Sequence, residues 1–266
     1  MREVDIIIPT VKSPLLVSIA IKAYEKFTPN FKLNYIVVEN SYDETHREYI
    51  TSLAENVTWI KNGRDFMSEA PPIDRSNIGS YIVASSYEKG LESATSDLVF
   101  FSHNDVAPVS DNWLDFLVSK IDSGFTIAGM MRDDWRIYAV HSCSLLTTRE
   151  YAKSVSFYPV YEEGKHGSAL DVGDKLSLVA RRQGMLEFAC RNTHNHRAYA
   201  ETLQEPFKSF KVVRCLDDDG KVIFLHLGRG TPKHFGRYSK QGGSALLHEW
   251  VAFLESEIKI EIPGER

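Results

Sequence analysis

Short apolar runs separated by longer amphipathic stretches dominate this sequence. The runs that predict buried strands are residues 4–8, 35–38, 57–60, 98–101, 125–131 and 222–225. Continuous apolar runs are typical of strands that are covered on both faces. The amphipathic stretches between them predict helices, one beginning at Pro14 and others over 81–93, 111–121 and 244–255. This alternation of strand and helix predicts a parallel sheet with right-handed crossovers.

Local signals predict where several of these helices begin and end. Ser13 followed by Pro14 has the pattern of an N-cap and first helical residue. Ser41 with Glu44, and Thr147 with Glu150, have the spacing of a capping box, which predicts a helix after each pair. A glycine at position 184 predicts the end of a helix over 167–183.

The central strand, 98–101, leads directly into the polar triplet His103-Asn104-Asp105. In open α/β sheets, ligands bind just beyond the carboxyl ends of the strands. A carboxylate at this place suits a divalent cation held mainly by oxygen ligands and a phosphate. The alternative is ordinary turn chemistry, in which Asn and Asp side chains bond to their own backbone.

The stretch 167–183 contains two further carboxylates, Asp171 and Asp174. On the predicted helix they share a face with Leu178, at positions i, i+3 and i+7. Acids near the start of a helix are also favoured by its dipole, so their spacing alone leaves a structural role open.

Three other polar clusters are candidates for ligand contacts. Arg75 and Asn77 precede a predicted helix, where an anion could bind or where they could act as a plain cap. His194 and His196 could ligate zinc from a strand, but no third ligand lies nearby in the sequence. His226 ends the last predicted strand and is followed by glycines at 228 and 230, which allow close approach of a ligand.

Composition limits the classes of function. The chain has 266 residues, a net charge of −5 and 43% apolar residues, as in an ordinary soluble protein, and no basic block that would suit nucleic acid. Cys143, Cys190 and Cys215 are too widely spaced for a disulfide framework or zinc knuckle, which favours a reducing, cytoplasmic setting. No apolar run is long enough to span a membrane. The helix over 244–255 leaves peripheral membrane contact or a second subunit open, although packing onto the domain is the simpler expectation.

The order of these features resembles the GT-A fold glycosyltransferases, specifically the inverting family-2 type. The segment HND at 103–105 stands where that family has its DxD-type metal motif, DVGD at 171–174 resembles the segment that supplies the catalytic base, and HLG at 226–228 resembles the late metal-binding histidine. The remaining segments that resemble the family are VDIIIPT at 4–10, VVENSYD at 37–43, NIG at 77–79 and ATSDLVFF at 94–101. Glu39 and His103 depart from the family pattern, because each replaces the usual Asp.

The resemblance implies an α/β, GT-A (Rossmann-like) fold with a mostly parallel central sheet flanked by helices and an acceptor-side C-terminal half. Residues 1–110 would form the nucleotide-sugar-binding half. Residues 111–243 would form the acceptor-binding and catalytic half of the same domain, and residues 244–266 a C-terminal helix and tail.

The resemblance also implies roles for individual residues. Asp105, His226 and His103 would hold Mn²⁺ or Mg²⁺. Asp174 would be the general base, with Asp171 beside it to raise its pKa, to orient the acceptor or to act as the base itself. The residues expected to contact the nucleotide sugar are Thr10, Glu39, Arg75, Asn77 and Asn104.

The implied activity is transfer of a hexosyl or deoxyhexosyl group, with inversion, from a nucleotide-diphosphate sugar to a glycan, lipid-linked or small-molecule hydroxyl, as in polysaccharide or glycoconjugate biosynthesis. Two alternatives stay open: a non-catalytic GT-A-like protein that binds glycan or nucleotide, and a retaining GT-A transferase. A nucleotidyltransferase should have a Gly-rich loop after the first strand, and residues 10–14 do not form one.

Overall fold

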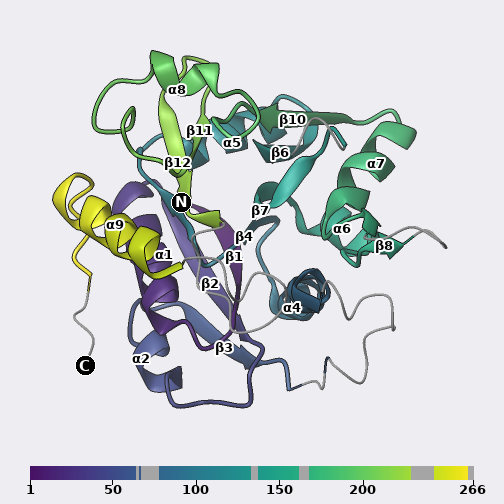
Figure 1. Cartoon of the computed structure of the whole chain (residues 1–266). Coiled ribbons are helices and arrows are strands. Elements are labelled where there is room, and N and C mark those ends of the chain that lie inside the picture. Colours follow the sequence, from purple (N-terminus) through teal and green to yellow (C-terminus); the bar gives the residue numbers. More distant parts are fainter. Residues whose placement is uncertain (64–65, 67–77, 133–136, 162–167, 229–242, 263–266) are drawn as a thin grey trace.

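The structure is a computed structural model that describes the chain except for residues 64–65, 67–77, 133–136, 162–167, 229–242 and 263–266. A seven-stranded sheet forms its centre (Figure 1). Its strands are β1 (Arg2–Thr10), β2 (Phe31–Glu39), β3 (Val57–Lys61), β4 (Leu98–Ser102), β6 (Phe125–Met131), β7 (Val140–Thr148) and β10 (Leu186–Cys190). A smaller sheet contains β5 (Val106–Pro108), β11 (Val213–Leu216) and β12 (Val222–His226), and β8 (Val160–Tyr161) pairs with β9 (Ser168–Leu170).

The main sheet has the order β10-β6-β7-β4-β1-β2-β3, and among these strands β7 runs antiparallel to both of its neighbours while the other pairs are parallel. The predicted mostly parallel α/β sheet is therefore confirmed. Because β7 is reversed, its first residues lie at the edge where β1, β2, β4 and β6 end. That edge carries the polar residues discussed below.

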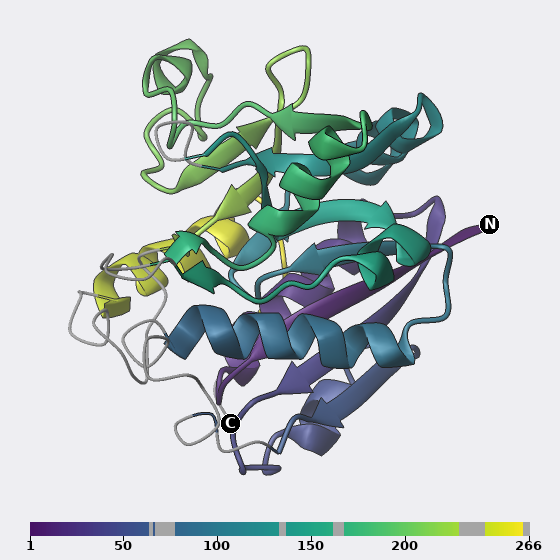
Figure 2. The same cartoon turned by 90° about the vertical axis from the view of Figure 1, so that its right-hand side faces the viewer.

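Helices cover both faces of the sheet, as continuous apolar strands require. The helices are α1 (Pro14–Phe27), α2 (Arg47–Thr51), α4 (Ile78–Ser93), α5 (Trp113–Asp122), α6 (Arg149–Ser154), α7 (Asp174–Arg182), α8 (Ala198–Thr202) and α9 (Gly243–Ser256). Strand β1 shows the alternation: Ile6 and Ile8 pack with α1 and α5, whereas Ile7 packs with α4. Figure 2 shows α4 lying along its face of the sheet.

Helix α4 approaches β1 very closely. A Cβ atom built at Gly90 would lie 2.5 Å from Cγ2 of Ile7. Any larger residue at position 90 would therefore force Ile7 or the helix to move. The close contact holds α4 against the middle of the sheet and sets the position of its N-terminal end near the polar edge.

Helix α9 packs on α1 and the small sheet, which confirms the expectation that it covers the domain (Figure 1). Trp250 and Leu254 are fully buried in this contact. No helix in the described parts of the chain is long and apolar enough to cross a membrane.

The structure corrects several predicted helix boundaries. Helix α2 begins only at Arg47, because the Ser41 hydroxyl accepts the Asp43 N–H in a turn in place of a capping box. The cap of α6 is Thr148, one residue later than predicted, and its side chain accepts the Tyr151 N–H.

The predicted helix over 167–183 is also wrong in its first part. Residues 168–170 form β9, and α7 begins at Asp174. Asp171 therefore precedes the helix, and it does not share a helical face with Asp174. His194 and His196 lie in a turn region after β10, so the strand that a His-x-His zinc site needs is absent there.

Candidate functional site

A cluster of one carboxylate and two imidazoles lies where β4 and β12 end. Each of His103, Asp105 and His226 offers one ligand atom, and these atoms lie within 4.8 Å of one another. Asp105 Oδ1 is 3.5 Å from His226 Nε2 and 3.9 Å from His103 Nδ1. The three residues that the sequence predicts as metal ligands are thus brought together from positions more than a hundred residues apart.

The backbone after β12 holds Asp105 in place. The N–H of Leu227 donates to the Asp105 carbonyl, and the N–H of Gly228 donates to Asp105 Oδ2, both at 3.0 Å. Gly228 has a φ of 61°, a left-handed conformation that favours glycine. Oδ1 is consequently the oxygen that faces the imidazoles, and the side chain is only 3% exposed.

The donor set fits a divalent metal ion. With metal–ligand bonds of about 2.1 Å, two ligands of one ion are separated by about 3–4 Å, which includes both distances around Asp105. Burial alone would lower the pKa of His226, but the neighbouring Cys143 and Asp105 raise it above its ordinary value. A carboxylate with two imidazoles suits Mn²⁺ slightly better than Mg²⁺.

A third imidazole, His141 at the start of β7, lies beside this cluster. Its ring centre is 5.8 Å from that of His103 and 6.1 Å from that of His226. His141 was not among the predicted site residues, because only the antiparallel register of β7 against β4 brings it to this edge. Burial lowers the pKa of His141 well below its ordinary value, and the positive charge of Arg132 lowers it further.

Arg132, just after β6, joins the two predicted catalytic acids. Its guanidinium lies 2.8 Å from Asp171 Oδ2 and 2.9 Å from Asp174 Oδ1. Asp174 Oδ2 in turn accepts the Asp171 N–H at 2.8 Å. Arg132 was not among the predicted site residues, so these ion pairs were not predicted.

The two acids differ in their access to a ligand. The Asp171 side chain is 18% exposed, whereas that of Asp174 is 1% exposed. Burial alone would raise the pKa of Asp171, but Arg132 holds it below its ordinary value. Asp171 is therefore a charged carboxylate that is partly open to solvent.

Thr10 and Glu39 lie at the ends of β1 and β2, and both are 3% exposed. The Glu39 carboxylate accepts the N–H groups of Ser41, at 2.8 Å, and of Lys12, at 3.3 Å, so it orders the loops after both strands. Burial raises the pKa of Glu39.

Asn104 connects this side of the edge to the metal candidates. Its Nδ2 donates to Thr10 Oγ1 at 3.3 Å, so Thr10, Glu39 and Asn104 belong to one edge. Arg75 and Asn77, the other predicted contacts of the nucleotide sugar, lie outside the described residues.

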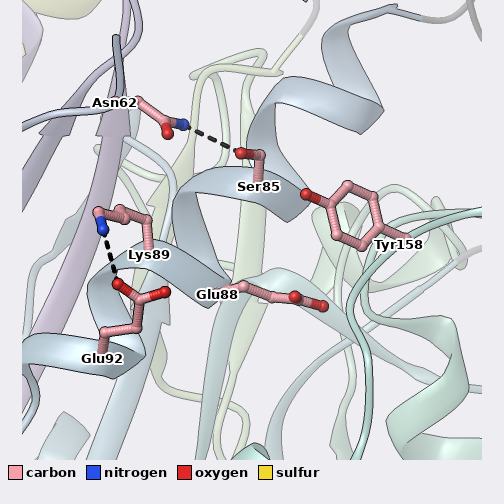
Figure 3. Close-up of a pocket in the computed structure, with 6 residues that line it drawn as sticks. All are labelled: Asn62, Ser85, Glu88, Lys89, Glu92 and Tyr158. Carbon is pink, nitrogen blue, oxygen red and sulfur yellow. Dashed lines mark hydrogen bonds and ion pairs between the residues drawn. The ribbon is translucent and has the colours of Figure 1, made fainter. Parts of the chain in front are cut away.

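A polar pocket of about 310 Å³ lies apart from these residues, along α4 (Figure 3). Asn62 donates to Ser85 there, and Lys89 pairs with Glu92 (Figure 3). Glu88 accepts the Phe157 N–H. These polar groups already bind protein atoms, and none of the predicted site residues lines the pocket.

No protein-family model and no curated protein matches this chain. Among solved structures, the galactosyltransferase LgtC, in complex with donor and acceptor sugar analogs, is similar over 93% of this chain and 95% of its own, with 14% identity and a TM-score of 0.57.

Two further structures match over 71% of this chain. One is glucosyl-3-phosphoglycerate synthase from Mycobacterium tuberculosis with Mn²⁺, UDP and glucosyl-3-phosphoglycerate, with 14% identity, a TM-score of 0.46 and 70% of its chain covered. The other is the mannosyltransferase PcManGT from Pyrobaculum calidifontis with GDP-Man and Mn²⁺, with 15% identity, a TM-score of 0.48 and 54% of its chain covered. Another mycobacterial protein is covered over 66% of its length. At these identities the likeness is one of fold.

Proposed function

We propose that this chain, whose fold is that of the GT-A glycosyltransferases, moves a sugar from a nucleotide-diphosphate donor to an acceptor hydroxyl. The observation that carries the proposal is the cluster of Asp105, His103 and His226 at the carboxyl edge of the sheet. In this fold class a ligand binds at that edge, and the cluster has the donor atoms of a site for a divalent ion bound to a diphosphate.

Asp105 and His226 would hold the ion, with His103 as the third ligand. When bound, Mn²⁺ or Mg²⁺ would neutralise the charge that grows on the leaving diphosphate. The chain orders the ligands before the ion arrives, because two backbone N–H groups after β12 already fix Asp105.

Asp171 and Asp174 are the candidates for proton transfer. Asp174 is the base that the family resemblance favours, but the greater exposure of Asp171 supports it as the acceptor of the hydroxyl proton. Asp174 would then act through Arg132, which binds both carboxylates. Attack in line by the deprotonated hydroxyl would give inversion at the anomeric carbon.

We also divide the proposed contacts between two halves of the chain. Thr10, Glu39 and Asn104 fall within residues 1–110, and we assign the nucleotide to this half. Asp171 and Asp174 fall within residues 111–243, which we assign to the acceptor. Three buried cysteines, Cys143, Cys190 and Cys215, form no disulfide, which supports a reducing, cytoplasmic setting. The role that we propose there is polysaccharide or glycoconjugate synthesis.

The test is calorimetric titration of the protein with UDP, GDP and dTDP, each with Mn²⁺ and with EDTA. We expect one nucleotide to bind tightly with Mn²⁺ and to lose its affinity in EDTA and in Asp105→Ala. As a matched control, Asp115→Ala, on the outer part of α5, should bind as the wild type does. Absence of nucleotide binding under every condition would contradict the proposal and favour a non-catalytic glycan-binding protein.

The stereochemistry of the product tests the mechanism separately. NMR of the first-formed product from a defined sugar donor should show the opposite anomeric configuration to that of the donor. A retained configuration would support the retaining GT-A alternative and would remove the need for a base at Asp171 or Asp174.

A further inference from the structure

We infer that His141 binds the donor, by donating a hydrogen bond from Nε2 to an oxygen of the diphosphate or of the transferred sugar. This inference rests on the proposed function and adds to it a contact on β7 that the sequence does not predict. The first observation is its position: the ring lies about as far from His103 as from His226, with centre-to-centre distances of 5.8 and 6.1 Å.

The hydrogen bonds of the described residues establish which ring nitrogen is available. The backbone N–H of Cys143 donates to His141 Nδ1 at 3.0 Å. A neutral imidazole that accepts at Nδ1 carries its proton on Nε2, and Nε2 is then a donor. The bonds in the described structure engage Nδ1 and not Nε2, and the ring is only partly buried. The Nε2–H of His141 thus lies on a ring next to the metal ligands, in a site that, under the proposed function, contains the oxygens of a diphosphate and a sugar.

His141 is not placed as a fourth metal ligand. The ligand atoms that lie within 4.8 Å of one another belong to His103, Asp105 and His226, and His141 is outside this group. A nitrogen that carries a proton also has no lone pair for a metal. Ion binding and donor binding should therefore respond differently when His141 is changed.

The backbone holds His141 firmly from its C-terminal side. The Tyr87 hydroxyl donates to the carbonyl of Ser142 at 2.7 Å, and the His103 N–H donates to the carbonyl of Cys143 at 3.0 Å. Both bonds join β7 to its neighbours at the site, so the imidazole needs little ordering when a donor binds.

The test compares His141→Ala and His141→Gln with the wild type, and with His248→Ala on the exposed side of α9 as a control. Electron paramagnetic resonance measures Mn²⁺ affinity, and calorimetry measures the affinity for UDP, GDP, dTDP and the matching nucleotide sugars. We expect His141→Ala to bind Mn²⁺ within about twofold of the wild type but the donor at least tenfold more weakly, as for one hydrogen bond to a charged acceptor. Gln, which keeps an N–H donor, should restore most of this affinity.

Comparison of the nucleoside diphosphate with its nucleotide sugar distinguishes the two groups whose oxygen could accept the hydrogen bond from His141. Equal losses for the nucleoside diphosphate and its sugar would place the acceptor on the diphosphate, and a loss for the nucleotide sugar alone would place it on the sugar. Unchanged donor affinity in His141→Ala, or a parallel loss of Mn²⁺, would overturn the inference. Nitrogen NMR of the free protein gives an independent check, since a proton on Nδ1 would also overturn it. Failure of the proposed function differs from these outcomes, because the wild type itself would then bind no nucleotide.

Discussion

At the scale of single residues, Arg132 is the side chain on which most of the acceptor side depends. It is 5% exposed and pairs with Asp174, which is 1% exposed, and with Asp171, which is 18% exposed. Replacing one partner of a buried ion pair leaves an uncompensated charge, which is more costly than the intact pair is stabilising. Arg132 is thus a positioning residue that keeps Asp171 both charged and oriented.

We therefore expect Arg132→Gln to lower the free energy of unfolding at pH 7 by about 3–5 kcal/mol. Without the guanidinium, burial raises the pKa of Asp171 in the folded state. The folded variant then takes up protons more readily than the unfolded chain does, so its deficit should shrink as the pH falls toward the ordinary carboxyl range. Urea unfolding at several pH values measures this change. Arg2→Gln, which breaks an exposed pair with Asp122, should cost about 1 kcal/mol or less. A deficit that grows at low pH would contradict the explanation.

Asp171→Asn and Asp174→Asn should have different effects. The first removes the more exposed carboxylate, so we expect transfer to fall by about 10²–10⁴-fold while nucleotide binding stays intact. The second leaves that carboxylate in place, and its main effect should be on stability. Initial-rate assays well below each melting temperature, with calorimetry of the nucleotide, separate the two. A larger loss of transfer in a folded Asp174→Asn protein would identify Asp174 as the base.

At the scale of elements, the close packing of α4 on β1 depends on Gly90. Gly90→Ala should destabilise the protein by about 1–3 kcal/mol, because the added Cβ would meet Ile7 in a packed core. Alanine has a better helix propensity than glycine, so a loss of stability in Gly90→Ala would come from packing. Gly79, in the same helix, has open space around the position that a Cβ would take, and Gly79→Ala should be neutral or stabilising by up to about 1 kcal/mol. Thermal unfolding of both variants is the measurement, and equal behaviour would refute the packing explanation.

The elements were predictable where local signals agreed with the long-range packing. Strand β6 was predicted to the residue, and α1 begins at the predicted Pro14. The prediction of a helix directly after Ser41 and Glu44 failed, because the Ser41 hydroxyl accepts the Asp43 N–H in a turn and does not cap a helix. The predicted start of the helix over 167–183 also failed, because residues 168–170 pair with the short strand β8 just before them, and Asp171 therefore precedes α7.

The residues of the site were likewise predictable only in part. Asp105 and His226 follow strongly apolar strands, so their place at the carboxyl edge could be inferred from the sequence. Arg132 directly follows the predicted strand 125–131, so its place at this edge could also be inferred, but its two carboxylate partners could not. His141 could not be found in this way, because the antiparallel register of β7 brings it to the edge. Sequence periodicity shows which face a residue takes, but it does not show which strand lies beside it.

At the scale of the whole molecule, the proposed donor should stabilise the fold. A ligand that binds only the folded state at a hundred times its Kd contributes about 2.7 kcal/mol. For a chain of this size that corresponds to a rise in Tm of roughly 5–10 °C. We expect Mn²⁺ with the preferred nucleotide to produce this rise in differential scanning fluorimetry, and EDTA to abolish it. Asp105→Ala should show no rise, and a rise of equal size in that variant would show that the ligand binds elsewhere.

The reversed strand β7 has a consequence for how such a protein can diversify. The chain leaves the site at Arg132 and re-enters it at His141, so a single connection carries the ion-pair partner of the proposed catalytic acids at one end and the proposed donor contact at the other. Connections after β1, β2, β4 and β12 carry the other proposed contacts of the donor. Exchange of residues 132–141 between related chains should therefore change the proposed acid pair, through Arg132, and the proposed donor contact, through His141, together, while the contacts at Thr10 and Glu39 are unchanged.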